Sequence, residues 1–250
     1  MQAKFSSSRM ITIMMFPASI LLPIVVFAQA EASLPVAPGL HSRTLLNANE
    51  PAIHYAISIP GNYSPPARAP LILALHFGVR GRDPAGPGRD VVRILVGPAL
   101  AELGAIIVAP DSIQGDWSSP ENERSVNALL DMVLASYSVD KDRIAVTGFS
   151  MGGGGAWHFA AKYPERFSAA IPVAGRPPES VSGWRLPILA IHSRDDQVMP
   201  IGPTEMRIAE LQKSGVNAKL IALSGITHFQ TYRFVDGLRQ SVPWLKEIWK

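Results

Sequence analysis

One serine stands in a setting that suits covalent catalysis. Gly148-Phe149-Ser150-Met151-Gly152 matches the pattern G-x-S-x-G, in which the serine occupies a tight turn between a strand and a helix. The strand-like run Arg143–Thr147 leads into this turn, and helical spacing over Met151–Tyr163 leads out of it. We therefore predict Ser150 as the nucleophile of an acyl transfer. The backbone N–H of Met151, at the helix start, is predicted to stabilise the oxyanion.

Four consecutive glycines, Gly152–Gly155, open the predicted helix. Each glycine in a helix costs up to about 1 kcal/mol relative to alanine, so the run predicts close backbone packing. Two alternatives are a glycine-rich turn around an ordinary serine and a phosphate-binding loop. The second lacks the Lys-Ser/Thr pair that such a loop requires after its glycines.

A serine hydroxyl needs a base within hydrogen-bond reach, and the base needs an acid that orients it. His228 follows the apolar run Ala218–Leu223, and Asp195 and Asp196 follow the run Ile188–His192. This gives the chain order serine, acid, histidine that accompanies the G-x-S-x-G turn. We predict His228 as the base and prefer Asp196 as the acid. Asp195 is the alternative, and both acids are also candidates for capping the next helix.

Further residues are expected around this centre. The loop after the strand Leu71–His76 is predicted to supply a second oxyanion donor, the N–H of Phe77 or Gly78, with a plain turn as the alternative. Trp117 is either a wall of the substrate pocket or a partly buried structural residue. The predicted substrate-binding residues are Trp117, Phe149 and Phe229.

Strand-like and helical segments alternate along the chain, which predicts an α/β fold with a mostly parallel sheet and helices on both faces. The expected strands are residues 52–59, 71–76, 105–109, 143–147, 169–173, 188–192 and 218–223. The expected helices are residues 91–103, 121–136, 151–163, 203–214 and 234–248. Only Arg176–Leu186 separates Ala169–Gly175 from the next strand, which is too short for a cap domain with its own core.

The N-terminus is typical of an exported protein. Lys4 and Arg9 precede the uncharged, mostly apolar run Met10–Phe27, and Ala28-Gln29-Ala30 offers a signal-peptidase site. An uncleaved membrane anchor is the alternative. The expected organisation is a signal peptide over residues 1–30, an N-terminal extension over 31–51 and a catalytic domain over 52–250. The mature protein is then predicted to be secreted or periplasmic, without a stable membrane span.

Composition narrows the possible partners. Hydrophobic residues make up 47% of the chain and charged residues 17%, as in globular proteins. Loss of residues 1–30 would remove two basic residues and no acidic one, lowering the net charge from +3 to +1. Since there is no run of Lys and Arg, we expect no nucleic-acid partner. The absence of cysteine excludes disulfides and thiolate metal sites, and no metal is expected.

Taken together, these stretches resemble the compact carboxylesterases, the phospholipase/carboxylesterase-like hydrolases and the feruloyl esterase or polyhydroxybutyrate depolymerase-like proteins of the α/β-hydrolase superfamily. The likeness covers roughly residues 52–250. Its most specific segments are Val139-Asp140-Lys141-Asp142-Arg143-Ile144, the Ser150 motif, Tyr163-Pro164-Glu165-Arg166-Phe167 and Asp196-Gln197-Val198-Met199-Pro200. Phe77 and Phe229 depart from the family pattern, in which a glycine commonly follows each of the preceding histidines. Both changes are expected to narrow the acyl pocket.

The resemblance implies an α/β-hydrolase fold without a cap domain, a triad of Ser150, His228 and Asp196, and no cofactor. It also implies hydrolysis of a small-molecule or polymer-linked carboxylic ester through an acyl-enzyme. A serine peptidase of the same fold is an alternative, because it uses the same apparatus. A catalytically inactive polysaccharide-binding module is a second alternative, and the complete triad argues against it.

Overall fold

The computed structural model describes residues 34–46, 51–79 and 86–250. The predicted signal peptide, residues 1–30, lies outside the described residues. Within the described ranges, none of the helices has the length and apolar character needed to cross a membrane.

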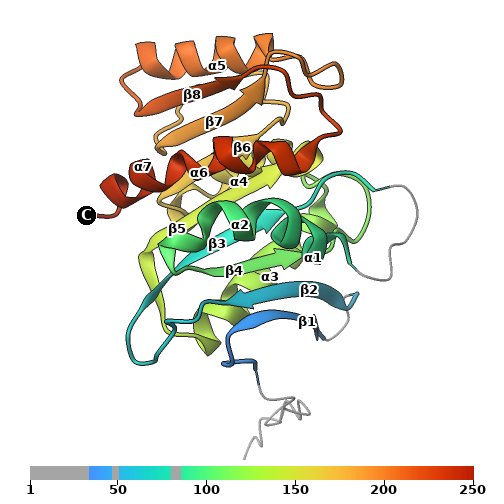
Figure 1. Ribbon diagram of the computed structural model, residues 1–250, viewed down its shortest axis with the longest axis vertical. Helices are drawn as coiled ribbons and strands as arrows, with labels where there is room; N and C mark the ends of the chain where they lie inside the picture. The colour runs from blue at the N-terminus through green and yellow to red at the C-terminus, as the bar shows by residue number, and fades with distance from the viewer. Residues whose placement is uncertain (1–33, 47–50, 80–85) are drawn as a thin grey trace, which may run out of the picture. The chain divides into compact units, whose positions relative to one another are not determined.

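A single eight-stranded sheet runs through the protein (Figure 1). Its strands are β1 (Gly39–Leu45), β2 (Ile53–Ile59), β3 (Ala69–Leu75), β4 (Ile106–Pro110), β5 (Val139–Phe149), β6 (Ala169–Val173), β7 (Ile188–Ser193) and β8 (Ala218–Leu223). The spatial order is β1-β2-β4-β3-β5-β6-β7-β8. Strands β3 to β8 pair in parallel, whereas β2 pairs antiparallel with both β1 and β4. The predicted α/β class and mostly parallel sheet are confirmed.

Helices cover both faces of the sheet (Figure 1). One face packs against α3 (Pro120–Ser136), α4 (Met151–Lys162) and α5 (Gly202–Lys213). The other face packs against a helical stretch made of α1 (Pro87–Val91), η1 (Val92–Val96), α2 (Gly97–Leu100) and η2 (Ala101–Leu103), and against α6 (Val235–Arg239) and α7 (Ser241–Ile248). The short helices η3 (Pro164–Arg166) and η4 (Thr231–Phe234) complete the described helices. The central strands β3, β4, β6 and β7 are buried throughout, as their continuous apolar sequences require.

Several segments differ from the sequence predictions, among them the predicted helix 91–103, which begins at Pro87 and is divided into α1, η1, α2 and η2. Residues 39–45, expected within the N-terminal extension, form the edge strand β1, which pairs with β2 along its full length. The sheet therefore begins before the predicted boundary at residue 52. Strand β5 begins at Val139 instead of Arg143, because Val139 pairs with Ala69 across a register shift. The final predicted helix is divided into η4, α6 and α7.

Residues 174–187, between β6 and β7, contain neither helix nor strand. Trp184 anchors this connection, since its ring packs against Trp157 at 5.3 Å and its indole N–H donates to the Leu186 carbonyl. No cap domain is inserted here, as predicted. The carboxyl ends of the parallel strands are left without an added domain at this position.

Candidate active site

Ser150 lies in a strained turn between β5 and α4. Its backbone has φ 58° and ψ −116°, a conformation rare for a residue with a side chain. The turn is held because the Ser150 N–H donates to the Val173 carbonyl and the Gly154 N–H donates to the Ser150 carbonyl, both at 3.0 Å. Surrounding structure must hold such a conformation in place. The turn sets the serine at the carboxyl end of β5, in the place predicted from its motif.

The glycine run at the start of α4 permits close backbone contacts. A Cβ on Gly152 would lie 1.9 Å from the Leu75 carbonyl oxygen, and one on Gly153 would lie 2.4 Å from the Val173 carbonyl oxygen. Both distances exclude any side chain. A Cβ on Gly154 would lie 3.5 Å from its nearest neighbour, the Arg176 carbonyl oxygen, which is an ordinary van der Waals contact. The expectation of close packing is therefore confirmed at Gly152 and Gly153, whereas Gly154 is not required sterically.

The structure brings together the three side chains that the sequence places far apart. The Nε2 atom of His228 is 2.7 Å from Ser150 Oγ, and its Nδ1 atom is 2.7 Å from Asp196 Oδ2. His228 and Asp196 are each 5% exposed, whereas Ser150 is partly exposed. Both distances are within hydrogen-bond range. A hydroxyl, an imidazole and a carboxylate thus form one continuous chain, in which the imidazole links the other two groups.

Asp196 is oriented by its own loop. Its second carboxylate oxygen, Oδ1, accepts the N–H groups of Val198 at 2.9 Å and Met199 at 2.7 Å. Oδ2 is thereby directed to His228. Nearby His192 is held by the Met199 carbonyl and by the hydroxyl of Thr204, and burial lowers the pKa of its imidazole. Between the two predicted acids, it is Asp196 that contacts the histidine.

Asp195 instead joins the acid loop to the histidine loop. Its carboxylate accepts the N–H of Gly225 at 2.6 Å, and the hydroxyl of Ser193 donates to the Ile226 carbonyl at 2.6 Å. These bonds hold the segment that precedes His228. The sequence offered a signal for this role, because Ser193 and Asp195 flank the end of the strand. The sequence pattern places Asp195 only as the alternative acid or as a helix cap, and it gives Ser193 no role.

Phe149 does not face the site as predicted. It is buried, and its ring packs at 5.3 Å from the His228 ring with an interplanar angle of 33°. Phe234 supports it from another side at 5.1 Å, and Phe77 at 6.3 Å. Because its side chain is buried, Phe149 cannot touch a substrate in this structure, and its predicted role as a substrate-binding residue is wrong. The side chain supports the imidazole from within the core.

Trp117 is also buried, which corrects its assignment as a pocket wall. The indole is 1% exposed and donates to the His76 carbonyl at 2.9 Å, so the structural alternative holds. The His76 ring packs edge-on against it at 5.0 Å. His76 Nε2 accepts the Ser112 N–H at 3.0 Å, so Nδ1 carries the proton that is donated to the Phe77 carbonyl at 2.6 Å. Burial lowers the pKa of His76 to about 4, which keeps this imidazole neutral.

The predicted oxyanion donors lie on two adjoining segments. Met151 is in the first turn of α4, where backbone N–H groups have no intrahelical acceptor. A Cβ on Gly78 would lie 3.9 Å from Met151 Sδ, so the loop after β3 packs against the start of α4. Phe77 precedes Gly78 in that loop and is partly exposed. Phe229 is 77% exposed, and its ring lies edge-on to His228 at 5.9 Å, so it borders the histidine from the solvent side.

In residues 34–46, 51–79 and 86–250, no three His, Asp or Glu side chains are grouped so that they could hold a metal ion. The described part of the chain therefore offers no candidate metal centre beside the Ser150–His228–Asp196 chain.

A family model described as PETase, PET hydrolase-like, matches residues 93–249, which is more than half of the chain. The chain belongs to the PET hydrolase-like family. The matched part of this PET hydrolase-like protein includes Ser150, Asp196 and His228, but not the first three strands of the sheet.

Two curated relatives of the PET hydrolase-like chain are named after ester substrates. The "Probable feruloyl esterase C" of Aspergillus terreus is 29% identical over 166 residues, which cover 64% of this chain and 62% of that protein. Cutinase est1 of Thermobifida alba is 28% identical over 184 residues, which cover 69% of this chain and 60% of that protein. The match thus spans less than two thirds of the length of each relative.

Solved structures agree with the fold. A structure described as that of a thermostable esterase has a TM-score of 0.68 at 24% identity, covering 83% of this chain and 62% of that chain. The esterase Est2 of Thermogutta terrifontis has a TM-score of 0.63 at 19% identity, covering 84% and 93%. These likenesses show that the PET hydrolase-like chain has the α/β-hydrolase fold.

Proposed function

We propose that this protein is a serine hydrolase that cleaves carboxylic esters. The observation that carries the proposal is the hydrogen-bonded chain from Ser150 through His228 to Asp196, at 2.7 Å for both links. The names of the two relatives, a feruloyl esterase and a cutinase, support ester substrates.

In the proposed reaction, His228 Nε2 accepts the proton of the Ser150 hydroxyl as its oxygen attacks the ester carbonyl carbon. Asp196 holds the imidazole through Nδ1 and stabilises the imidazolium that forms. The resulting oxyanion is stabilised by the N–H of Met151 together with that of Phe77 or Gly78. The imidazolium then protonates the departing alcohol, which leaves an acyl group on Ser150 Oγ. Water, deprotonated by His228, attacks the acyl-enzyme and releases the acid.

The proposed substrate is an ester of a small molecule or one linked to a polymer. The support is the short connection between β6 and β7, residues 174–187, which adds no domain over the strand ends. Phe229 offers an exposed aromatic ring next to His228 and is the residue we propose for contact with an apolar acyl or aryl group.

Labelling with a fluorophosphonate probe tests the proposal directly. The purified protein is expected to be labelled, and Ser150→Ala is expected to lose labelling and about 10⁴-fold or more of kcat toward a short-chain 4-nitrophenyl ester. Turnover of the ester by an unlabelled protein, or full activity in the variant, would refute the assignment. Faster cleavage of a matched 4-nitroanilide than of the ester would replace esterase by peptidase.

We also propose that the protein is exported, with cleavage after Ala30. The support is the charge and hydropathy pattern of residues 1–30. N-terminal sequencing of the protein recovered outside the cytoplasm is expected to begin at Glu31. Recovery with Met1 intact would contradict cleavage.

A further inference from the structure

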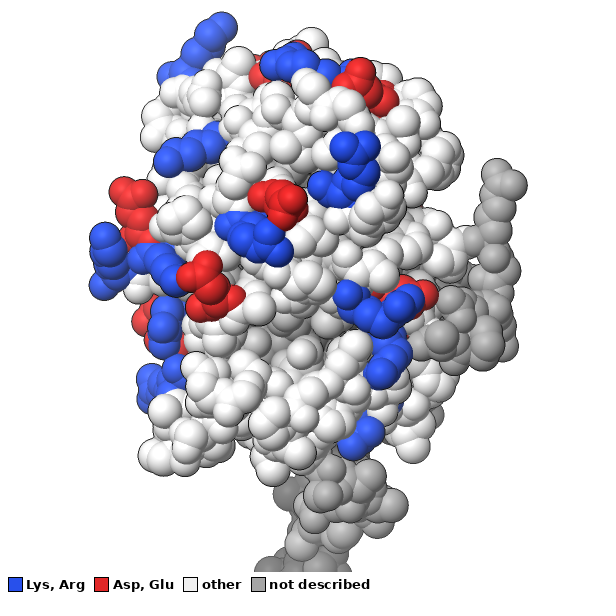
Figure 2. Space-filling view, in the orientation of Figure 1, with Lys and Arg blue, Asp and Glu red and all other residues white. Residues whose placement is uncertain are grey.

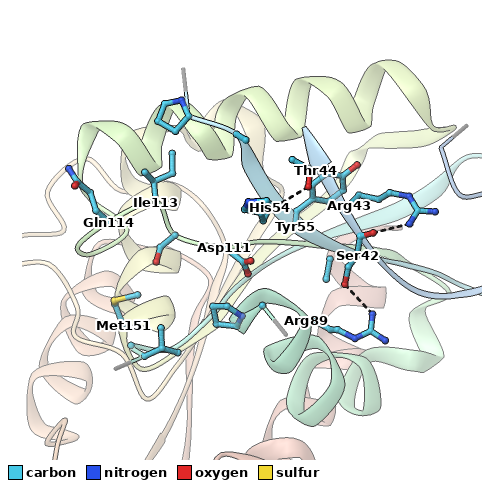
Figure 3. A pocket seen from close by; sticks show the side chains of 18 of the residues that line it. Ser42, Arg43, Thr44, His54, Tyr55, Arg89, Asp111, Ile113, Gln114 and Met151 are labelled. Carbon is cyan, nitrogen blue, oxygen red and sulfur yellow. Dashed lines mark hydrogen bonds between the residues drawn. The ribbon is translucent and has the colours of Figure 1, made fainter. Parts of the chain in front are cut away.

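A groove of about 1140 Å³ opens beside the proposed oxyanion donors. Gly78 and Met151 line one part of it, and Ile113 and Gln114 from the loop after β4 form a wall there. The remaining wall comes from β1, β2 and the start of α1, with Ser42, Arg43, His54 and Arg89 among its residues. In Figure 3, Met151 and the two arginines lie on opposite sides of this space. Its volume exceeds what one ring-sized group fills.

Two guanidinium groups meet at Ser42. Arg43 Nη1 donates to the Ser42 carbonyl at 2.8 Å, and Arg89 Nη1 donates to the Ser42 hydroxyl at 3.3 Å and to the Leu40 carbonyl at 3.2 Å (Figure 3). All of these acceptors are neutral. Among the residues that the structure describes, neither arginine forms an ion pair, and the buried Nε of Arg43 has no hydrogen-bond partner. Each guanidinium has five N–H donors, so donors remain at both groups.

Within residues 34–46, 51–79 and 86–250, no acidic side chain forms an ion pair with Arg43 or Arg89. Among the described residues that line the groove, Asp111 carries the one carboxylate, which accepts the Gly88 N–H at 2.8 Å. His54 is exposed, and its Nδ1 is hydrogen-bonded to the Thr44 hydroxyl at 3.0 Å. On the face shown in Figure 2, Lys and Arg lie beside Asp and Glu in some places and stand alone in others.

The groove thus changes in character along its length. Near the nucleophile turn it is lined by Met151, Ile113 and Val79, which suit an aryl or alkyl group. On the far side it presents arginine donors, whose planar geometry matches a carboxylate. We propose that this groove binds the part of an ester substrate that carries a carboxylate, with Arg43 and Arg89 as the residues that recognise it. The inference rests on the proposed function and adds the substrate class.

Matched substrates test this inference. On the acyl side, the monomethyl ester of benzene-1,4-dicarboxylic acid is compared with its neutral analogue, in which a carboxamide replaces the carboxylate. On the alcohol side, 4-acetoxybenzoate is compared with 4-acetoxybenzamide. The wild-type protein is expected to prefer the carboxylate in one of the two pairs by about tenfold in kcat/KM. The pair that shows the preference identifies the side of the ester that lies in the groove.

Variants then assign the preference to residues. Arg43→Gln and Arg89→Gln are each expected to reduce the carboxylate-to-carboxamide ratio by about threefold or more, and the double variant to bring it near one. Arg93→Gln is the matched control, because Arg93 is exposed, pairs with Asp90 at 3.1 Å and does not line the groove. It is expected to keep the wild-type ratio.

A measurement on the wild-type protein covers the case in which a variant fails to fold. Free benzene-1,4-dicarboxylate is expected to inhibit hydrolysis of 4-nitrophenyl acetate competitively and more strongly than its diamide, and 0.5 M salt is expected to weaken that inhibition. Turnover of 4-nitrophenyl acetate without a preference in either pair would overturn the inference alone. A preference for the carboxylate that is unchanged in the Arg43→Gln, Arg89→Gln double variant would also overturn it. Absence of turnover on all esters would overturn the proposed function as well.

Discussion

Two histidines lie at the same edge of the sheet, His76 after β3 and His228 before η4, and they differ in what they can do. Both are buried, and each packs against a buried aromatic ring: His76 against Trp117 at 5.0 Å and His228 against Phe149 at 5.3 Å. The nitrogens of His76 are bonded to backbone groups, whereas those of His228 are bonded to a carboxylate and a hydroxyl. Only His228 has both a hydroxyl from which it can accept a proton and a carboxylate that can stabilise the imidazolium formed. Hydrogen-bond partners, more than burial or position, distinguish the proposed catalytic histidine from the structural one.

The largest expected effect separates the two histidines by activity. His228→Ala is expected to lower kcat toward a short-chain 4-nitrophenyl ester by roughly 10⁴- to 10⁶-fold, because the serine loses its proton acceptor. His76→Gln is expected to lower it by less than about tenfold, because the His76 ring packs against Trp117 and its nitrogens bond to backbone groups and not to the Ser150 hydroxyl. Steady-state kinetics on folded variants, checked by circular dichroism, measures both. A similar loss of kcat in His228→Ala and His76→Gln would contradict the assignment of different roles to the two histidines.

The next effect separates the two adjacent acids. Asp196→Asn is expected to reduce kcat by about 10³- to 10⁴-fold, since an amide at this place favours the wrong tautomer of His228. Asp195→Asn is the matched control and is expected to cost much less, because Asp195 contacts the Gly225 N–H and not the imidazole. A larger loss in the Asp195 variant would assign the orienting role to the other acid.

The lowered pKa of His76 predicts that the free energy of unfolding depends on pH. Its folded-state pKa is lowered by burial to about 4, below the ordinary value of 6.5. The stability that the neutral imidazole contributes is therefore present above pH 6.5 and is lost as the pH falls from 6.5 through 4. The loss is about 3 kcal/mol.

Urea unfolding of wild type and His76→Gln between pH 7 and pH 4 measures this contribution. The gap in unfolding free energy between the two proteins is expected to narrow by that amount on acidification. His192, whose pKa burial also lowers, contributes in the same direction in both proteins and cancels from the gap. A gap that stays constant with pH would show that His76 is not held neutral.

The smallest expected effect compares the two aromatic supports. Phe149→Leu is expected to reduce kcat by about five- to tenfold, because the His228 ring loses the flat surface against which it is held. Trp117→Phe removes a hydrogen bond to the His76 carbonyl and is expected to lower stability by about 1–2 kcal/mol, with kcat within about twofold of wild type. Thermal unfolding and kinetics on both variants check this. A greater loss of kcat in Trp117→Phe would reverse the comparison.

Local sequence patterns predicted most elements of the sheet. Strands β6 and β8 begin and end where predicted, because each is a short apolar run with clear boundaries. The edge strand β1 was missed because its burial is irregular and its apolar residues do not alternate with polar ones. The early start of β5 was missed because Asp140, Lys141 and Asp142 interrupt its apolar pattern, and only pairing with β3 makes it a strand.

The sequence by itself determined the strained turn at Ser150, since a glycine-flanked serine between a strand and a helix is a local pattern, and it determined the chain order of serine, acid and histidine. It did not determine the burial of Trp117 and Phe149, or which neighbouring aspartate meets the histidine. Those outcomes depend on strands distant in the chain becoming neighbours in the order β5-β6-β7-β8. Side-chain surroundings are set by such long-range packing, whereas turns and caps are set by adjacent residues. For this reason the tertiary structure alone decided which predicted residues contact one another.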